Sequence, residues 1–131
     1  MDDASLRADE EGFHSAYRVF LDALRMLGST AAEQCESMGD FNVAWELKDD
    51  TKAGKYFVGR GYLNAEQEAW LCALAGALDA VPAQVLQAGS GRENNLAAMS
   101  HPSWIPLRVM ASHALEALSP FTTENSKFLG L

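Results

Sequence analysis

Long stretches of this chain repeat apolar residues every three to four positions, which is the spacing of side chains on one face of an α-helix. The clearest stretch covers residues 4–27 and is followed by Gly28, a residue type that often terminates helices. Its apolar face consists of Leu6, Phe13, Ala16, Tyr17, Phe20, Leu24 and Leu27. No segment alternates apolar and polar residues as a half-buried strand does, and no internal repeat is visible. The chain is therefore predicted to be all-α.

The opposite face of this first segment is polar. Glu11, His14, Arg18, Asp22 and Arg25 follow one another at helical spacing. Opposite charges at that spacing form exposed pairs that stabilise a helix by a few tenths of a kcal/mol each. We expect this whole face, including His14, to be exposed to solvent.

Two further helices are predicted before residue 60. Ser29 or Thr30 is a suitable N-cap for a segment that runs to Met38, and Gly39 either ends that helix or lies inside a longer one. Residues 41–58 then place apolar and small side chains on a common face, which we expect to be buried. That face consists of Val43, Ala44, Leu47, Thr51, Gly54 and Val58.

The next segment has two apolar faces. Asn64 to Gln67 resemble a capping box with Asn as the N-cap, so a helix is predicted from about Ala65 to about residue 80. One face carries Leu71, Leu74 and Leu78, and the other carries the small residues Ala69, Ala73, Gly76 and Ala80. Small residues allow a neighbouring helix to come close, so this segment is predicted to be the central helix.

The C-terminal third contains two short apolar pieces and one long one. A short helix is predicted after Pro82, and a second short piece ends at Met99. Pro106 suits the first turn of a final helix, which the Ser-Pro pair ending at Pro120 is expected to terminate. Residues 121–131 would then form a tail that either docks or lies loose.

The length favours one domain. A chain of 131 residues that is 48% hydrophobic can bury a core of its own. We therefore predict a single domain over residues 1–131, built as an all-α bundle of about five or six helices. No stretch approaches the length of an apolar membrane span, and no secretory leader is visible, so we expect a cytoplasmic protein.

The net charge of −8 lies entirely in the first 50 residues. That segment has twelve acidic and four basic residues, whereas the rest of the chain has six of each. Nucleic acids and anionic membranes require clustered Lys and Arg, so neither is an expected ligand. A one-sided acidic charge instead favours a protein partner with a basic surface.

The chemistry-bearing residues form no recognisable catalytic pattern. Cys35 and Cys72 lie inside helical segments without metal-ligand spacing, and the simplest interpretation is two free thiols. A nucleophilic pairing of either thiol with His101 stays open. His113 and Glu116 stand in the reverse order of the Glu-x-x-His motif of di-iron bundles, which favours a surface pair. We therefore predict no enzyme, no metal and no cofactor.

The polar residues of segment 41–58 divide by sign. Glu46, Asp49 and Asp50 lie on one side, while the lysines form a second stripe. An ordinary solvated helix, with its aromatic residues packed on a neighbour, is the simpler interpretation. The functional alternative is a recognition surface in which an aromatic anchor binds and carboxylates steer a basic partner. Its candidate residues are Glu33, Glu36, Asp40, Trp45, Glu46, Asp49, Asp50 and Tyr56.

Three short stretches resemble those of small acidic helical bacterial immunity proteins, the cognate inhibitors of toxins used in interbacterial competition. They are AWELKDD at residues 44–50, GYLNAEQ at 61–67, and AMSHPSW at 98–104 followed by Leu107 and Arg108. The stretches cover under a quarter of the chain. The resemblance implies tight stoichiometric binding, often by occlusion of an active site, and no cofactor. It assigns no binding residues.

Two other functional classes stay open. A small acidic secretion chaperone or adaptor would bind an unfolded or apolar effector segment and would dimerise, and an exposed apolar groove would favour it. A small enzyme would need a concave pocket in which a His converges with a carboxylate or a Cys.

Overall fold

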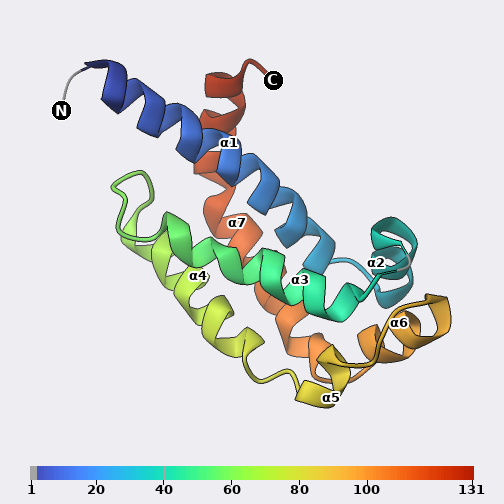
Figure 1. Ribbon diagram of the computed structural model, residues 1–131. Helices are drawn as coiled ribbons and strands as arrows, with labels where there is room; N and C mark the ends of the chain where they lie inside the picture. The colour runs from blue at the N-terminus through green and yellow to red at the C-terminus, as the bar shows by residue number, and fades with distance from the viewer. Residues whose placement is uncertain (1–2, 40) are drawn as a thin grey trace.

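The computed structural model describes residues 3–39 and 41–131, which form seven α-helices and one 3₁₀ helix and contain no β-strand. The helices are α1 (Asp3–Leu27), α2 (Ala31–Met38), α3 (Val43–Lys52), η1 (Ala53–Phe57), α4 (Ala65–Leu78), α5 (Ala83–Leu86), α6 (Arg92–Met99) and α7 (Trp104–Leu129), as Figure 1 shows. The predicted all-α class is confirmed. The number of α-helices exceeds the predicted five or six because both short segments before α7 form separate helices.

Side-chain caps set the starts of the helices between α1 and α5. The Thr30 hydroxyl accepts a hydrogen bond from the Glu33 N–H at the start of α2, and Asn42 accepts one from the Trp45 N–H at the start of α3. Asn64 and its partner in the capping box begin α4 as predicted. Gly39 ends α2 with a φ of 84°, so two separate helices, and not one continuous helix, lie between residues 31 and 52.

The core lies where α1, α3, α4 and α7 meet. Tyr17 and Leu24 of α1, Leu47 of α3, Leu74 of α4 and Leu118 of α7 are all buried. Figure 1 shows α3 in front of α7 and α1 crossing the C-terminal half of α7. The short helices α2, α5 and α6 lie together at one end. No described helix is both long enough and apolar enough to cross a membrane.

The prediction that α4 is central is wrong. Its leucine face is buried, but Ala69, Ala73, Gly76 and Ala80 are exposed. The space that small side chains leave is filled only if another helix lies over them, and the neighbours of α4 all pack on its leucine side. The helix therefore lies at the edge of the molecule.

The predicted end of the last helix at Pro120 is also wrong, because α7 continues to Leu129. Tertiary contacts hold the segment after Pro120 on α1. Phe121 is buried, the Thr122 hydroxyl is hydrogen-bonded to the Tyr17 hydroxyl at 2.7 Å, and Arg18 donates to the Ser126 hydroxyl at 2.7 Å. These contacts outweigh the helix-breaking tendency of one exposed proline, so residues 121–129 dock as helix.

His14 is buried, in contrast to its predicted exposure. The buried Asn125 of α7 donates from its amide nitrogen to the Nδ1 of His14 at 3.0 Å and to its backbone carbonyl at 2.9 Å. The imidazole also stacks on Phe121 and Phe128, with ring centroids 5.3 and 4.1 Å apart. Of the predicted exposed charge pairs, Asp22–Arg25 is present at 3.8 Å.

Two buried amides fix the short helices around α3. Gln34 of α2 donates to the last carbonyls of α1 and accepts a hydrogen bond from Arg108 of α7. Asn95 of α6 accepts from the Val43 N–H at 3.1 Å and donates to the Phe41 carbonyl at 2.6 Å. Both side chains are buried, and their partners satisfy backbone groups at helix ends. Gln34 thus holds the end of α1, and Asn95 holds the start of α3.

Candidate protein-binding site

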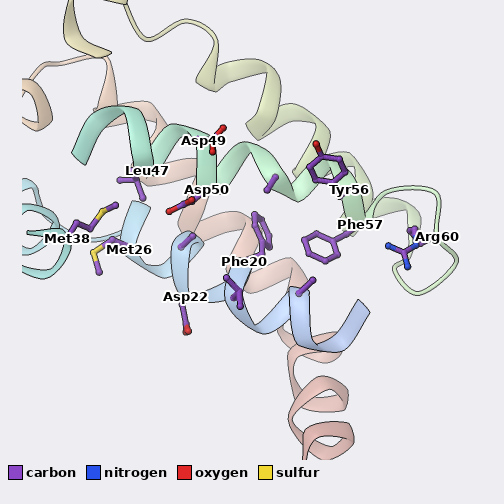
Figure 2. A pocket seen from close by; sticks show the side chains of 14 residues that line it. Phe20, Asp22, Met26, Met38, Leu47, Asp49, Asp50, Tyr56, Phe57 and Arg60 are labelled. Atoms are coloured by element: carbon purple, nitrogen blue, oxygen red, sulfur yellow. The ribbon is translucent and has the colours of Figure 1, made fainter. Parts of the chain in front are cut away.

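An open groove of about 730 Å³ runs between α1 and the continuous helical segment of α3 and η1. Its lining is mostly apolar, and Figure 2 shows these side chains on the two facing walls. The lining residues are Ala16, Val19, Phe20, Asp22, Ala23, Met26, Met38, Leu47, Asp49, Asp50, Ala53, Tyr56, Phe57 and Arg60. None of them is a His or a Cys.

The groove owes its shape to small residues beside large ones. Gly54 of η1 lets the ring of Phe20 come so close that a Cβ at position 54 would lie 2.7 Å from the Phe20 Cζ. Phe20 and Phe57 then form the floor with ring centroids 5.3 Å apart. The alanines at positions 16, 23 and 53 leave the space above this floor open.

The two ends of the groove differ. Met26 and Met38 lie at one end, and Arg60 lies at the other (Figure 2). Arg60 forms an ion pair with Asp9 of α1 at 2.8 Å and lies 5.2 Å from the ring centroid of Phe13. The Tyr62 hydroxyl also donates to Asp9, and this hydrogen bond, with Arg60, holds the pKa of the Asp9 carboxyl below its usual value. Arg60 is therefore committed to a partner within the chain.

The acidic residues of the groove lie beside its apolar floor. Figure 2 shows Asp50 pointing from α3 toward α1, Asp49 pointing the other way, and Asp22 on the outer side of α1. Partial loss of solvent contact, and then the negative charge of the neighbouring Asp49, raise the pKa of Asp50. Among the residues that the structure describes, neither Asp49 nor Asp50 forms an ion pair.

The lysines of α3 are in a different situation. Lys52 contacts Asp79, the residue after α4, at 2.6 Å, and Lys48 contacts the same carboxylate at 3.5 Å. The hydrogen bond from Lys52 holds the pKa of Asp79 below its usual value. Lys48 and Lys52 thus share a carboxylate within the chain, whereas Asp50 on the groove side of α3 has no ion pair in the described segments.

The structure divides the candidate residues on and after α3 into two groups. Asp49, Asp50 and Tyr56 line the groove, and the Tyr56 side chain is 77% exposed. Trp45 and Glu46 lie on α3 outside the groove lining. Trp45 is 55% exposed and so is not packed against a neighbouring helix.

The described candidate residues that precede α3 in the sequence do not line the groove. Glu33 is part of the cap of α2, where the Thr30 hydroxyl donates to its carboxylate at 2.9 Å. Glu36 lines a separate depression together with Cys35 and Arg92. Asp40 lies outside the described residues. The described carboxylates between residues 33 and 50 therefore face at least two different places.

The α1 wall of the groove was not among the predicted site residues. It is formed by Ala16, Val19, Ala23 and Met26, and Val19 is 71% exposed. Their spacing of three, four and three positions marks a second apolar stripe beside the buried one, and this signal is present in the sequence. A helix with a second apolar stripe offers a surface to a further helix.

The candidate catalytic residues do not converge. The Nδ1 of His101 is 2.9 Å from the Ser103 hydroxyl, and no hydrogen bond joins it to either cysteine in the described segments. Burial raises the pKa of the Cys35 thiol, which favours its unreactive form. His113 stacks on Trp70 with ring centroids 5.5 Å apart. The described residues include no group of three or more potential metal ligands.

No protein-family model, curated protein or solved structure matches this chain. Its function is therefore inferred from the groove, the charges beside it and the aromatic side chains around it.

Proposed function

We propose that this protein is an immunity-type protein, which binds a cognate bacterial toxin or effector in the cytoplasm and neutralises it by stoichiometric contact. The observation that carries the proposal is the pair Asp49 and Asp50, two carboxylates that form no ion pair with any described residue and lie at the edge of an exposed apolar groove. The protein acts by binding and not by catalysis, and it needs no cofactor.

Unpaired charge and apolar surface have separate roles in such an interaction. The carboxylates attract a basic partner over a distance set by ionic screening, about 8 Å at physiological salt. Affinity comes from the side chains that lose water on binding, and exposed aromatic residues such as Tyr56 and Trp45 are typical anchors. The three stretches that resemble immunity proteins support this role over that of a general scaffold.

The apolar groove also favours a second candidate, a secretion chaperone or adaptor. Such a protein keeps an effector segment extended or unfolded against its own surface. Val19 and Tyr56 at the mouth of the groove are large apolar side chains in contact with water, which is what a segment-binding surface requires. The two roles differ in the state of the bound partner.

Co-expression with the product of the neighbouring gene tests the proposal. We expect a complex of defined stoichiometry by native mass measurement, in which the partner is folded and its activity is lost. A complex in which the partner is unfolded would support the chaperone role. Absence of a complex would contradict both.

A charge-reversal pair localises the contact. We expect Asp49→Lys with Asp50→Lys to weaken partner binding by about tenfold or more, because the lost attraction becomes repulsion. Both side chains are exposed, so the free energy of unfolding should change by less than about 1 kcal/mol. The matched control is Glu93→Lys with Glu116→Lys, which makes the same charge change at exposed positions on α6 and α7. Equal weakening by both pairs would show that only the net charge matters.

A further inference from the structure

The groove has the length of a short helix. Its α1 wall extends from Ala16 to Met26, ten helical steps that rise about 1.5 Å each, so the wall is about 15 Å long. That length matches about three turns of a helix lying beside α1. Apolar side chains at positions i, i+3, i+4 and i+7 of such a helix would all fall within the groove.

The floor suits side chains of variable shape. Met26 and Met38 are half-buried at one end, and the unbranched thioether of methionine adapts to irregular neighbours. Phe20 and Phe57 give a firm apolar surface further along. A floor of this kind can pack against Leu, Ile, Met or Phe and does not select one of them over the others.

The charged residues at the edges of the groove indicate the charge of a segment that would bind in it. Asp49 and Asp50 belong to one wall, and Asp22, whose only ion pair in the described segments is an exposed one to Arg25, belongs to the other. The one cation of the lining, Arg60, is paired with Asp9. Asp50 points across the groove, and Asp49 and Asp22 lie at the outer edges of the two walls, so a helix in the groove would have carboxylates along both edges. This arrangement complements Lys or Arg on both sides of its apolar face.

We propose that the groove between α1 and the α3–η1 segment binds a single basic amphipathic helix of the partner, with apolar residues on the floor and Lys or Arg beside Asp22, Asp49 and Asp50. This inference rests on the proposed function, and it names the form of the partner at the site. A second copy of this chain is disfavoured because each copy carries a net charge of −8 and would bring further carboxylates to the groove.

Synthetic peptides test the proposal on the full chain. The probe is a peptide of about 16 residues, long enough to form a helix on binding, with Leu at i, i+3, i+4 and i+7 and Lys elsewhere. A peptide of the same composition in scrambled order controls for charge, and a version with Glu in place of Lys controls for the apolar face. Methyl NMR of protein labelled at methionine gives the location, because Met26 and Met38 line the groove whereas Met99 and Met110 do not.

We expect the patterned peptide to shift the Met26 and Met38 methyl signals in a saturable way, while the Met99 and Met110 signals stay in place. The scrambled and acidic peptides should bind at least about tenfold more weakly. Asp49→Asn with Asp50→Asn should weaken the patterned peptide by about tenfold, and Glu93→Gln with Glu116→Gln should not. Equal binding of the scrambled peptide, or silent Met26 and Met38 signals, would overturn the proposal.

Apolar variants test the floor independently of charge. Val19→Ser removes an exposed apolar side chain from the groove wall, and Val109→Ser makes the same change on α7 outside the groove. Because both valines are exposed, both variants should stay folded. Weaker peptide binding is expected from the first variant only, and equal affinities for the two would contradict the proposed site.

The two proposals fail in different ways. If the patterned peptide does not bind in the groove but the natural partner binds and responds to Asp49→Lys with Asp50→Lys, the helix in the groove is wrong and the proposed function stands. If the peptide binds in the groove but no toxin or effector partner is neutralised, the site is correct and the proposed function is wrong.

Discussion

Phe20 of α1 packs closely on η1 because position 54 has no side chain. We expect Gly54→Ala to lower the free energy of unfolding by about 1–3 kcal/mol, because the added methyl group would overlap the buried Phe20 ring. Gly76→Ala is the matched control. It lies on the exposed face of α4 with nothing within 4 Å of its new Cβ, and it should raise stability by up to about 1 kcal/mol. Urea unfolding of the three proteins measures both changes. A neutral Gly54→Ala would show that the ring moves aside at little cost.

His14 makes stability depend on pH. Burial lowers its pKa below the usual 6.5, although Glu10 and Glu124 oppose the effect. The neutral ring accepts a hydrogen bond from Asn125, whereas the protonated ring would present an N–H to that donor. Between the lowered pKa of folded His14 and pH 6.5, the unfolded chain therefore binds a proton at His14 more readily than the folded chain does. The contribution of His14 is fully present above that pH and is lost as the pH falls toward the lower folded pKa.

We expect the free energy of unfolding to fall between pH 7 and the pKa of folded His14, by about 1.4 kcal/mol for each unit by which folding lowers that pKa. Urea unfolding at a series of pH values measures the slope. His14→Gln should flatten the curve in this range, while His113→Gln, at an exposed position, should leave it in place. A flat curve for the unmodified protein would mean that the buried ring is not held neutral.

At the scale of the helix, Pro120 is a local defect that tertiary contacts override. We expect Pro120→Ala to raise the free energy of unfolding by about 1–3 kcal/mol, because the new N–H can donate to the Glu116 carbonyl one turn earlier. Pro106→Ala is the control, since Pro106 lies in the first turn of α7, where no carbonyl of the helix needs its N–H. That variant should be neutral, or less stable by up to about 1 kcal/mol because its unfolded state gains freedom. Thermal or urea unfolding distinguishes the two outcomes.

Helix starts and most of the apolar stripe of α1 were predictable because their signals are local, whereas Leu6 and Ala16 of the predicted stripe are exposed. The capping residues Thr30 and Asn64 act on N–H groups three positions away, and the stripe of α1 needs only helical periodicity. The end of α7 was not predictable, because it depends on contacts between residues more than 100 positions apart, such as Tyr17 and Thr122. His14 follows the same rule, since its burial requires Asn125.

The groove shows the same limit at the scale of the molecule. The sign separation on α3 and the second apolar stripe on α1 are both present in the sequence. The sequence does not show that the acidic side of α3 meets the second apolar stripe of α1, because α2 and the residues before α3 separate them in the chain. Phe41 and Val43 at the start of α3 are held by Asn95, a buried amide from α6 whose role no local pattern indicates. Similarly, Asp79 lies at the end of α4 and pairs with the lysines of α3 only because α4 packs beside α3.

The uneven charge of the whole molecule predicts how binding responds to salt. Association with the neutralised partner should slow about tenfold or more between about 50 mM and about 500 mM NaCl, because screening shortens the reach of the carboxylates. Dissociation should change much less, because it depends on buried apolar contacts. Stopped-flow mixing at several salt concentrations separates the two rates. An association rate that does not respond to salt would remove the acidic surface from the mechanism.

The docking of α7 on α1 also constrains when the chain can fold as it is synthesised. α1 is synthesised more than 100 residues before residues 121–128, which supply several of the groups that cover Tyr17 and His14. In the nascent chain this part of the aromatic face of α1 therefore stays uncovered until residues 121–128 have left the ribosome.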